Sequence, residues 1–325
     1  MALHKLLFIS VLLMCLSTVA SSKIVFSSNM DGNYEIYVMD DDGTNIRRLT
    51  HHPDKDTVPR WSADGKQIVF DREKRWQPGQ KGQQVDVFVV NRDGSQLQQI
   101  TDHPGLNIRP VWSPDGRHIA FGSGRSGTSE IYKIDIKTKE IKQLTRNLKG
   151  GAINMEDWSP DGKSIAYTAP SPPRWNTIYI TDANGSTHRE FLPGKGTYRY
   201  SVQWSPDGKK ILYCEAAYQG NDLISNKIVI RDKDGLLKKE IDMTGKKFMH
   251  SVCWMGDHYL LIHAEAWSPP RLPTEIYRYT LVTGKMTNLT NRPSRERLGD
   301  WIDDAALAVL PPGKLSILWG QLKKP

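Results

Sequence analysis

Aromatic and arginine side chains stand together in several irregular, proline-rich segments of this 325-residue sequence. Three segments pair an arginine with a tryptophan, and a fourth offers a tyrosine: Arg75 with Trp76, Arg174 with Trp175, Arg271 with Trp267, and Tyr218. Aromatic rings and arginine are enriched at the energetic centres of protein interfaces, and proline lowers the entropy lost on ordering a loop. These segments therefore predict a recognition surface, or, alternatively, rings that cover the ends of a structural core.

Patterns for catalysis and metal binding are sparse. His263 and Glu265 are two residues apart, so on a strand they would share a face, but the fold would have to supply a third ligand such as His250. Glu156 and Asp157 could belong to a glycosidase pair only if a second carboxylate lay at a suitable distance. The sequence has no Gly-x-Ser-x-Gly nucleophile elbow. We therefore expect no catalytic residues, no metal ion and no cofactor.

One segment, Val111 to Thr145, is repeated along most of the chain. Six tryptophans recur 46 to 51 residues apart, and the first four are followed by Ser-(Ala/Pro)-Asp-Gly, in which glycine can take the positive φ of a tight turn. Runs such as Ile-Ala-Phe, Glu-Ile-Tyr and Leu-Thr recur in phase with them. The six tryptophans are Trp61, Trp112, Trp158, Trp204, Trp254 and Trp301.

Each repeat contains four short apolar runs separated by turn residues, which is the content of one blade of a β-propeller. A single repeat cannot bury its apolar face, so neighbouring repeats must stack. The sequence thus predicts an all-β fold, a six-bladed β-propeller of four-stranded antiparallel blades. We expect residues 298–303, around Trp301, to form the innermost strand of the blade whose other strands lie in residues 23–50.

The Trp-Ser-Pro-Asp-Gly core, the Glu-Ile-Tyr run and the Leu-Thr ending resemble the TolB-type β-propeller repeat, also described as the WD40-like PD40 repeat. The resemblance covers residues 23–303 and implies an exported bacterial propeller that binds a partner. TolB itself carries an α/β domain before its propeller. Here the first predicted strand begins two residues after a predicted cleavage site, so we expect a relative of TolB and not TolB itself.

The ends of the chain predict export. Residues 1–20 read as a signal peptide cleaved after Ala20, with an apolar run too short to span a bilayer. Residues 21–303 would form the propeller, and residues 304–325 an extra hairpin or tail. The formal net charge of +8 is scattered over the sequence, which favours solubility over nucleic-acid binding. Cys214 and Cys253 are expected to be buried thiols.

Loops between second and third strands, and between consecutive blades, open on one face of a propeller. We call it the long-loop face, because the arginine and aromatic segments fall in its loops. Polar residues ahead of the tryptophans, Asp56, Asn107, Glu156, Arg199 and Asp300 among them, are expected near the channel mouth on this face. The binding residues we predict are Trp76, Arg75, Trp175, Arg174, Tyr218, Trp267, Arg271, Arg109, His250 and Arg297.

The function predicted from the sequence is that of an exported, non-enzymatic β-propeller binding module, periplasmic or secreted and monomeric. It would recognise a protein or peptide of the cell envelope, or an envelope glycan, on its long-loop face. The alternative is a carbohydrate-active hydrolase or lyase with its site at the channel mouth, formed by Glu156, Asp300, His250 and His263.

Overall fold

Strands form nearly all the regular structure of this protein, whose computed structural model describes residues 22–75, 77, 79, 82–146, 154–171, 175–192, 196–266 and 273–304. Within these ranges the side chains of Ser171, Trp175, Phe248 and Ala266 are not described. The predicted signal peptide and nearly all of the predicted tail lie outside them. Among the described residues, no helix has the length and apolar character needed to cross a membrane.

The strands form six four-stranded antiparallel sheets, which we number as blades 1 to 6. From the inside outwards the blades are β24 (Glu296–Ile302), β1 (Lys23–Ser28), β2 (Glu35–Asp40) and β3 (Arg47–Arg48); β4 (Lys55–Trp61), β5 (Gln67–Glu73), β6 (Val85–Asn91) and β7 (Gln98–Gln99); β8 (Asn107–Trp112), β9 (His118–Ser123), β10 (Glu130–Asp135) and β11 (Ile141–Gln143); β12 (Asn154–Trp158), β13 (Ser164–Ser171), β14 (Trp175–Asp182) and β15 (His188–Leu192); β16 (Tyr198–Trp204), β17 (Lys210–Gln219), β18 (Asp222–Asp232) and β19 (Leu237–Asp242); and β20 (Lys247–Met255), β21 (Tyr259–Ala266), β22 (Glu275–Thr280) and β23 (Met286–Asn288).

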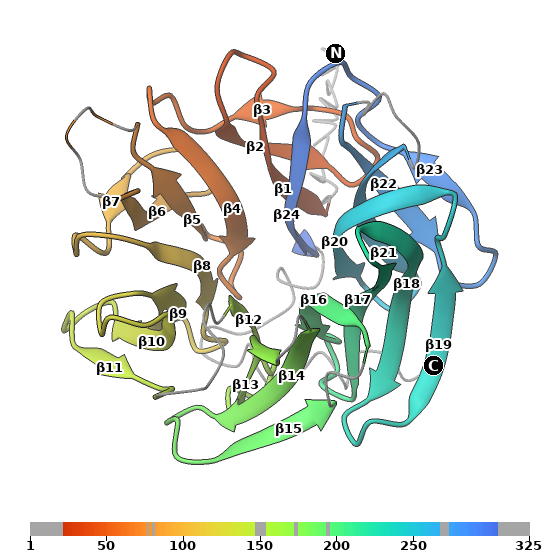
Figure 1. The fold of residues 1–325 in the computed structure, drawn as a ribbon. Coiled ribbons are helices and arrows are strands. Elements are labelled where there is room, and N and C mark those ends of the chain that lie inside the picture. The colour runs from red at the N-terminus through yellow and green to blue at the C-terminus, as the bar shows by residue number, and fades with distance from the viewer. Residues whose placement is uncertain are drawn as a thin grey trace, which may run out of the picture.

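The blades stand around a central channel, with one strand of each blade innermost (Figure 1). Blade 1 is built from both ends of the described chain, because β24 pairs antiparallel with β1, Lys23 opposite Ile302 and Ser28 opposite Glu296. The prediction of a six-bladed propeller closed by the Trp301 strand is confirmed. This pairing gives β1 a partner on its inner edge and so protects it from pairing with another chain.

The Ser-(Ala/Pro)-Asp-Gly turns share one hydrogen-bond pattern. In blade 3 the Ser113 hydroxyl donates to Asp115 Oδ1 at 2.5 Å, and the same carboxylate accepts the backbone N–H of Arg117 at 2.9 Å. Gly116 has a φ of 69°, in the left-handed region that glycine adopts without strain. The repeated motif therefore shapes the turn from the inner to the second strand, and its serine and aspartate side chains are used in hydrogen bonds within that turn.

The Glu-Ile-Tyr and Leu-Thr runs recur together because they bond to each other inside a blade. In blade 3 the Thr145 hydroxyl donates to Glu130 Oε2 at 2.5 Å and accepts the Ile131 backbone N–H at 2.9 Å. Equivalent pairs are Thr50 with Glu35, Thr101 with Asp86 and Thr290 with Glu275. These buried hydrogen bonds tie the third strand to the residue that ends the fourth.

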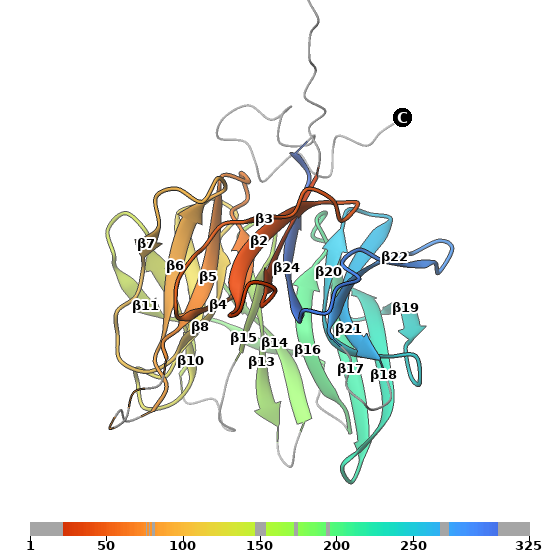
Figure 2. The same cartoon turned by 90° about the horizontal axis from the view of Figure 1, so that it is seen from above.

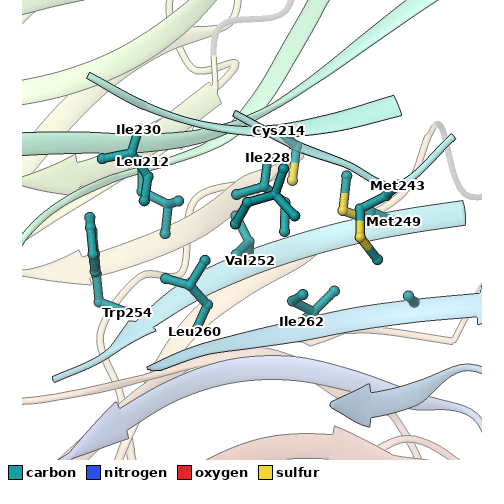
Figure 3. Packing of buried hydrophobic residues seen from close by; sticks show 12 residues of the cluster. Leu212, Cys214, Ile228, Ile230, Met243, Met249, Val252, Trp254, Leu260 and Ile262 are labelled. Carbon is teal, nitrogen blue, oxygen red and sulfur yellow. The ribbon is translucent and has the colours of Figure 1, made fainter. Parts of the chain in front are cut away.

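Apolar side chains fill the space between neighbouring blades. Between blades 5 and 6, Leu212, Ile228 and Ile230 face Val252, Trp254 and Leu260 (Figure 3). Cys214 lies in the same cluster, and both it and Cys253 are buried free thiols. The repeated tryptophan thus serves as inter-blade packing, which is the stacking that the repeats require.

We predict that Gly299→Ala in β24 destabilises the ring. A Cβ atom at this position would lie 2.7 Å from the Val25 carbonyl oxygen and closer still to Pro59 of blade 2. Overpacking of this kind typically costs about 1–3 kcal/mol. Gly124→Ala is the matched control, because a Cβ there meets nothing within 4 Å. Urea unfolding of the full chain measures both, and equal midpoints would contradict the prediction.

We also predict that Thr145→Val destabilises blade 3. Valine preserves the shape of threonine but leaves the Glu130 carboxylate and the Ile131 N–H without their shared partner. Unpaired buried polar groups cost about 1–3 kcal/mol each, and more when charged. Thr138→Ala, in an exposed turn, should change stability by less than about 0.5 kcal/mol. A Thr145→Val protein as stable as the parent in urea would refute the structural role of this pair.

Candidate functional site

A cavity of about 440 Å³ lies in the central channel at the long-loop face. All six inner strands contribute residues to its wall, together with loops between strands. We call it the channel-mouth cavity, and its polar lining includes Arg60, Arg109, Arg295, Arg297, Glu156, Glu265, His250, His263, Tyr200 and Ser201. Its position matches the face where the sequence places the long loops.

An irregularity in each inner strand helps to set which side chains reach this cavity. The pairing of every inner strand with its neighbour shifts register near the middle of the inner strand. Three residues at these shifts, Val58, Arg109 and Ser201, have positive φ between 53° and 55°. Such bulges re-aim side chains and are frequent beside functional sites. Backbone that leaves the regular ladder at these points also needs other hydrogen-bond partners.

Side chains of the adjacent blade supply those partners. Glu156 Oε2 accepts the Val202 N–H at 3.1 Å, and Asp71 Oδ2 accepts the Arg109 N–H at 3.1 Å. The Ser201 hydroxyl exchanges two hydrogen bonds with Val252. The walls of the cavity are thereby fixed by bonds between blades as well as within them.

Three arginines on the cavity wall, Arg109, Arg295 and Arg297, have no hydrogen bond or ion pair through their guanidinium groups among the described residues. Arg109 bonds through its backbone N–H alone, and Arg297 lies over the Tyr34 ring with its guanidinium carbon 4.2 Å from the ring centre. The cavity is lined by four arginines and two glutamates. Its electrostatic balance is therefore positive when the histidines are neutral.

A pair of histidines lies beside these arginines. The rings of His250 and His263 are 4.8 Å apart, and His250 Nε2 lies 3.7 Å from Glu265 Oε1. Burial, helped by nearby His250 and Arg297, lowers the pKa of His263 well below its usual value, with the Glu296 backbone opposing the shift. His263 is therefore neutral at pH 7.

Buried carboxylates surround the cavity wall. Burial raises the pKa of Glu156, although Arg109, Thr168 and the Val202 N–H oppose the shift. Burial raises the pKa of Asp71 to about 8, because only the Arg109 N–H and charge offset its desolvation. Asp71 is therefore largely protonated at neutral pH, and its Oδ1 has no hydrogen-bond partner.

Exposed aromatic side chains extend from the cavity onto the β17–β18 hairpin, which projects from the ring on the long-loop face (Figure 2). Tyr200 lines the cavity, and its ring centre is 5.7 Å from that of Tyr198. Tyr198, Tyr218 and Ile224 are 37%, 38% and 51% exposed. We call these three residues the tyrosine patch.

A second cavity, of about 240 Å³, lies at the opposite end of the channel and is lined by the six repeated tryptophans. Arg60 lines both cavities. Asp157 and Asp300 accept the backbone N–H groups of Trp204 and Trp61 in other blades. Burial raises the pKa of both carboxyls, to about 7 for Asp157, against the attraction of Arg60. These groups join blades and are already used in the structure of the ring.

The predicted binding residues divide into three groups. Arg109, His250 and Arg297 lie together on the wall of the channel-mouth cavity. Arg75 and Tyr218 are exposed on the same face. Arg75 lies on a loop, where its Nε donates to the Pro53 carbonyl at 2.8 Å, whereas Tyr218 lies near the end of β17 and not on the loop that the sequence suggested. The others, Trp76, Arg174, Trp267, Arg271 and the side chain of Trp175, lie outside the described residues.

Several polar residues expected near the channel mouth are instead bonded inside the blades. Asp56 forms a two-point ion pair with Arg72, at 2.6 and 2.7 Å, and Arg199 pairs with Glu215 at 2.9 Å. Asn107 donates to the carbonyls of Val85 and His103. These residues precede the register shift in their strands, and their side chains bond within their own sheets. Residues that follow in the same strands, such as Arg60 and Arg109, line the channel instead.

Sequence reasoning missed Arg60, Tyr198 and Tyr200. The alternation Tyr198-Arg199-Tyr200 was a usable signal, because alternate residues of a strand share a face. Arg60 carried no comparable signal, since it directly precedes a tryptophan and its direction depends on the bulge. Among the described residues, no three His, Cys, Asp or Glu side chains gather as metal ligands would.

Comparisons with known proteins agree with this architecture. The sequence model of the TolB beta propeller domain, PD40, matches residues 78–249. The Tol-Pal system protein TolB of Francisella tularensis subsp. tularensis strain WY96-3418 is 31% identical over 156 residues, which is 46% of this chain and 33% of that protein. The subsp. mediasiatica strain FSC147 protein of the same name is 32% identical over 119 residues, 35% of this chain and 25% of that protein. The matches thus span a third or less of these relatives.

Solved structures show the same fold at lower identity. TolB from Acinetobacter baumannii superposes with a TM-score of 0.68 at 20% identity, over 85% of this chain and 65% of that chain. An oligogalacturonate lyase from Vibrio parahaemolyticus superposes with a TM-score of 0.55 at 16% identity, over 82% and 74%. At these identities the likeness is one of fold, and a fold hosts many functions.

We predict that Asp71 makes the stability of the ring fall as pH rises. Its native pKa of about 8 exceeds the ordinary value of about 3.9. Between these pH values the native protein holds a proton that the unfolded chain has released, so stability declines by at most about 1.4 kcal/mol per pH unit from this group. Asp71→Asn keeps an acceptor for the Arg109 N–H and removes the titration.

The stability of Asp71→Asn relative to the parent should therefore grow between pH 5 and pH 8. Urea unfolding of both proteins at several pH values measures this difference. The contributions of the other carboxyl groups cancel in it, because both proteins contain them. Asp234→Asn, in an exposed turn, is the control and should give a curve parallel to that of the parent. A parallel curve for Asp71→Asn would show that Asp71 titrates normally.

Proposed function

Because this chain belongs to the TolB β-propeller (PD40) family, we propose that it is an exported, non-enzymatic binding module of the cell envelope, with a protein partner on its long-loop face. The relatives found by sequence are named as components of the Tol-Pal system. Because the alignments cover a third or less of those proteins, the identity of the partner is not carried over. Export to the periplasm is part of the proposal and rests on the signal-like residues 1–20.

The tyrosine patch beside the channel-mouth cavity is the observation that carries the proposal. A cavity alone would suit a small ligand, whereas exposed tyrosines next to it offer a wider contact surface. Tyrosine provides a large contact area at low entropic cost and is enriched at binding hot spots. The cavity and the patch are continuous through Tyr200, which lines the cavity and neighbours Tyr198.

The β17–β18 hairpin gives this surface a rigid base. Its two strands pair from Lys210 with Asp232 to Gln219 with Asp222. Tyr198 lies opposite Ala216 in the same sheet. A surface held by paired strands needs little ordering on binding, and this preserves affinity.

A lyase or hydrolase acting on acidic saccharides is the alternative, and one observation favours it. His250, His263 and Glu265 lie together beside two arginines in the same cavity. A neutral imidazole can act as a general base, and arginine can neutralise a uronate carboxylate. The fold is also that of an oligogalacturonate lyase. Turnover of oligogalacturonate by the purified chain, lost in His263→Gln, would establish this alternative.

We predict that the full chain captures a specific protein from the envelope fraction of its source, and that Tyr198→Ala/Tyr218→Ala loses most of it, by at least tenfold. Truncation of aromatic residues at a hot spot costs about 2 kcal/mol or more. Tyr259→Ala is the matched control, because Tyr259 is also 37% exposed but begins β21 at the opposite face. Quantitative mass spectrometry of the retained proteins makes the measurement. Equal capture by the three proteins would refute the proposed surface.

A further inference from the structure

The channel-mouth cavity holds guanidinium groups that make no hydrogen bond or ion pair among the described residues. Neither Arg109 nor Arg297 makes a guanidinium hydrogen bond or ion pair there. They come from β8 and β24, which stand on either side of β4 in the ring, and Arg60 of β4 lies between them in that order. Three neighbouring inner strands therefore turn one arginine each towards the same space.

The two glutamates of the cavity do not neutralise these arginines by contact. The Glu156 oxygens already accept hydrogen bonds from Thr168 and from the Val202 N–H. Glu265 lies on β21 of blade 6, with its Oε1 3.7 Å from His250 Nε2 of the paired strand β20. Glu156 therefore attracts Arg109 without a hydrogen bond or ion pair between them, and the guanidinium N–H groups remain available to an incoming anion.

His263 adds a neutral donor at the same wall. It is 7% exposed, and its Nε2 makes no close hydrogen bond, the Glu296 backbone being the nearest group that interacts with the ring. Its Nδ1 lies 3.5 Å from the Ser251 hydroxyl, and in the tautomer in which Nδ1 accepts that hydroxyl proton, Nε2 carries the ring hydrogen. An N–H buried in a cavity wall without a close hydrogen bond can donate to a ligand oxygen.

Charge and hydrogen-bond donors together favour a carboxylate. Guanidinium groups bind carboxylates through paired N–H donors, and charge at an interface governs specificity and the rate of association. An amide or hydroxyl would leave the positive charge of the cavity unmatched. A carboxylate on the partner would enter the cavity while its neighbouring residues contact the tyrosine patch.

We propose that Arg109 and Arg297, with His263 as a further donor, bind a carboxylate group of an acidic segment of the partner protein in the channel-mouth cavity. This inference rests on the proposed function, since it names the chemistry of the partner. It assigns different roles to the two parts of the face. The cavity selects for negative charge, and the tyrosine patch supplies contact area.

The test is a titration of the full chain with glutarate, a small dicarboxylate, followed by the NMR signals of the His250 and His263 ring protons. Glutaramide has the same shape without charge and is the matched ligand control. We expect saturable shifts with glutarate, none with glutaramide at equal concentration, and affinity weakened at least fivefold by Arg109→Gln or Arg297→Gln. Arg117→Gln, which lies at the opposite face and pairs with Asp135, should bind as the parent does.

Several results would overturn the proposal. Equal behaviour of glutarate and glutaramide, or unchanged affinity in both arginine variants, would remove the carboxylate site. Tighter binding of inorganic phosphate than of glutarate would make it a phosphate site. Tetraglutamate and digalacturonate distinguish the source of the carboxylate, and tighter binding of the saccharide would overturn a peptide ligand.

The titration and the capture experiment fail independently. Glutarate binding without any captured protein would refute the protein partner and leave the carboxylate site standing. A captured protein that is retained by Arg109→Gln/Arg297→Gln, with no glutarate binding, would refute the carboxylate site alone. Thermal unfolding of each variant shows that it is folded before either result is interpreted.

Discussion

Closure of the ring is the constraint on which the rest of this structure depends. Each blade has an apolar face that its own four strands cannot cover, so every blade needs a neighbour on both sides. Without β24 the first blade would lack its inner strand, and the edge of β1 would be open. Pairing of residues 296–302 with residues 23–28 joins the two ends of the described chain and completes the inter-blade packing at once.

The inner strands answer two demands that conflict. Each must pair with its own sheet and also direct side chains into the channel. In a regular strand, however, successive side chains point to the two faces of the sheet. The register shifts resolve this conflict because they redirect side chains towards the channel. They also take backbone N–H groups out of the regular ladder, and these groups donate hydrogen bonds to side chains of other blades, such as Asp71, Glu156 and Asp157. The consequence is a set of buried carboxyls with raised pKa values. Structure and site are therefore made from the same irregular positions.

The fold could be predicted from the sequence because its evidence is repeated six times. A motif such as Ser-Pro-Asp-Gly is weak alone, but its recurrence in phase with Trp, Glu-Ile-Tyr and Leu-Thr fixes strand number and order. The site could be predicted only in part, because it is built from single residues that differ between blades. Arg109, His250 and Arg297 were found from their place ahead of a tryptophan. The same reasoning misplaced Asp56, Asn107 and Arg199, since a shift of one residue at a bulge reverses the direction of a side chain.

The two ends of the channel show how a repeat fold separates stability from recognition. At one end the six tryptophans recur in every blade, and their neighbours Asp157 and Asp300 bond across blades, so little is free to vary. At the other end the inner strands differ from blade to blade, and different strands contribute Arg297, Arg109, Tyr200 and His250 to the same cavity. Recognition requires such asymmetry, because a ligand bound in identical surroundings from six sides would have no preferred orientation. The positive charge and the tyrosines lie at the end where the repeats diverge, and this is why we place the function there.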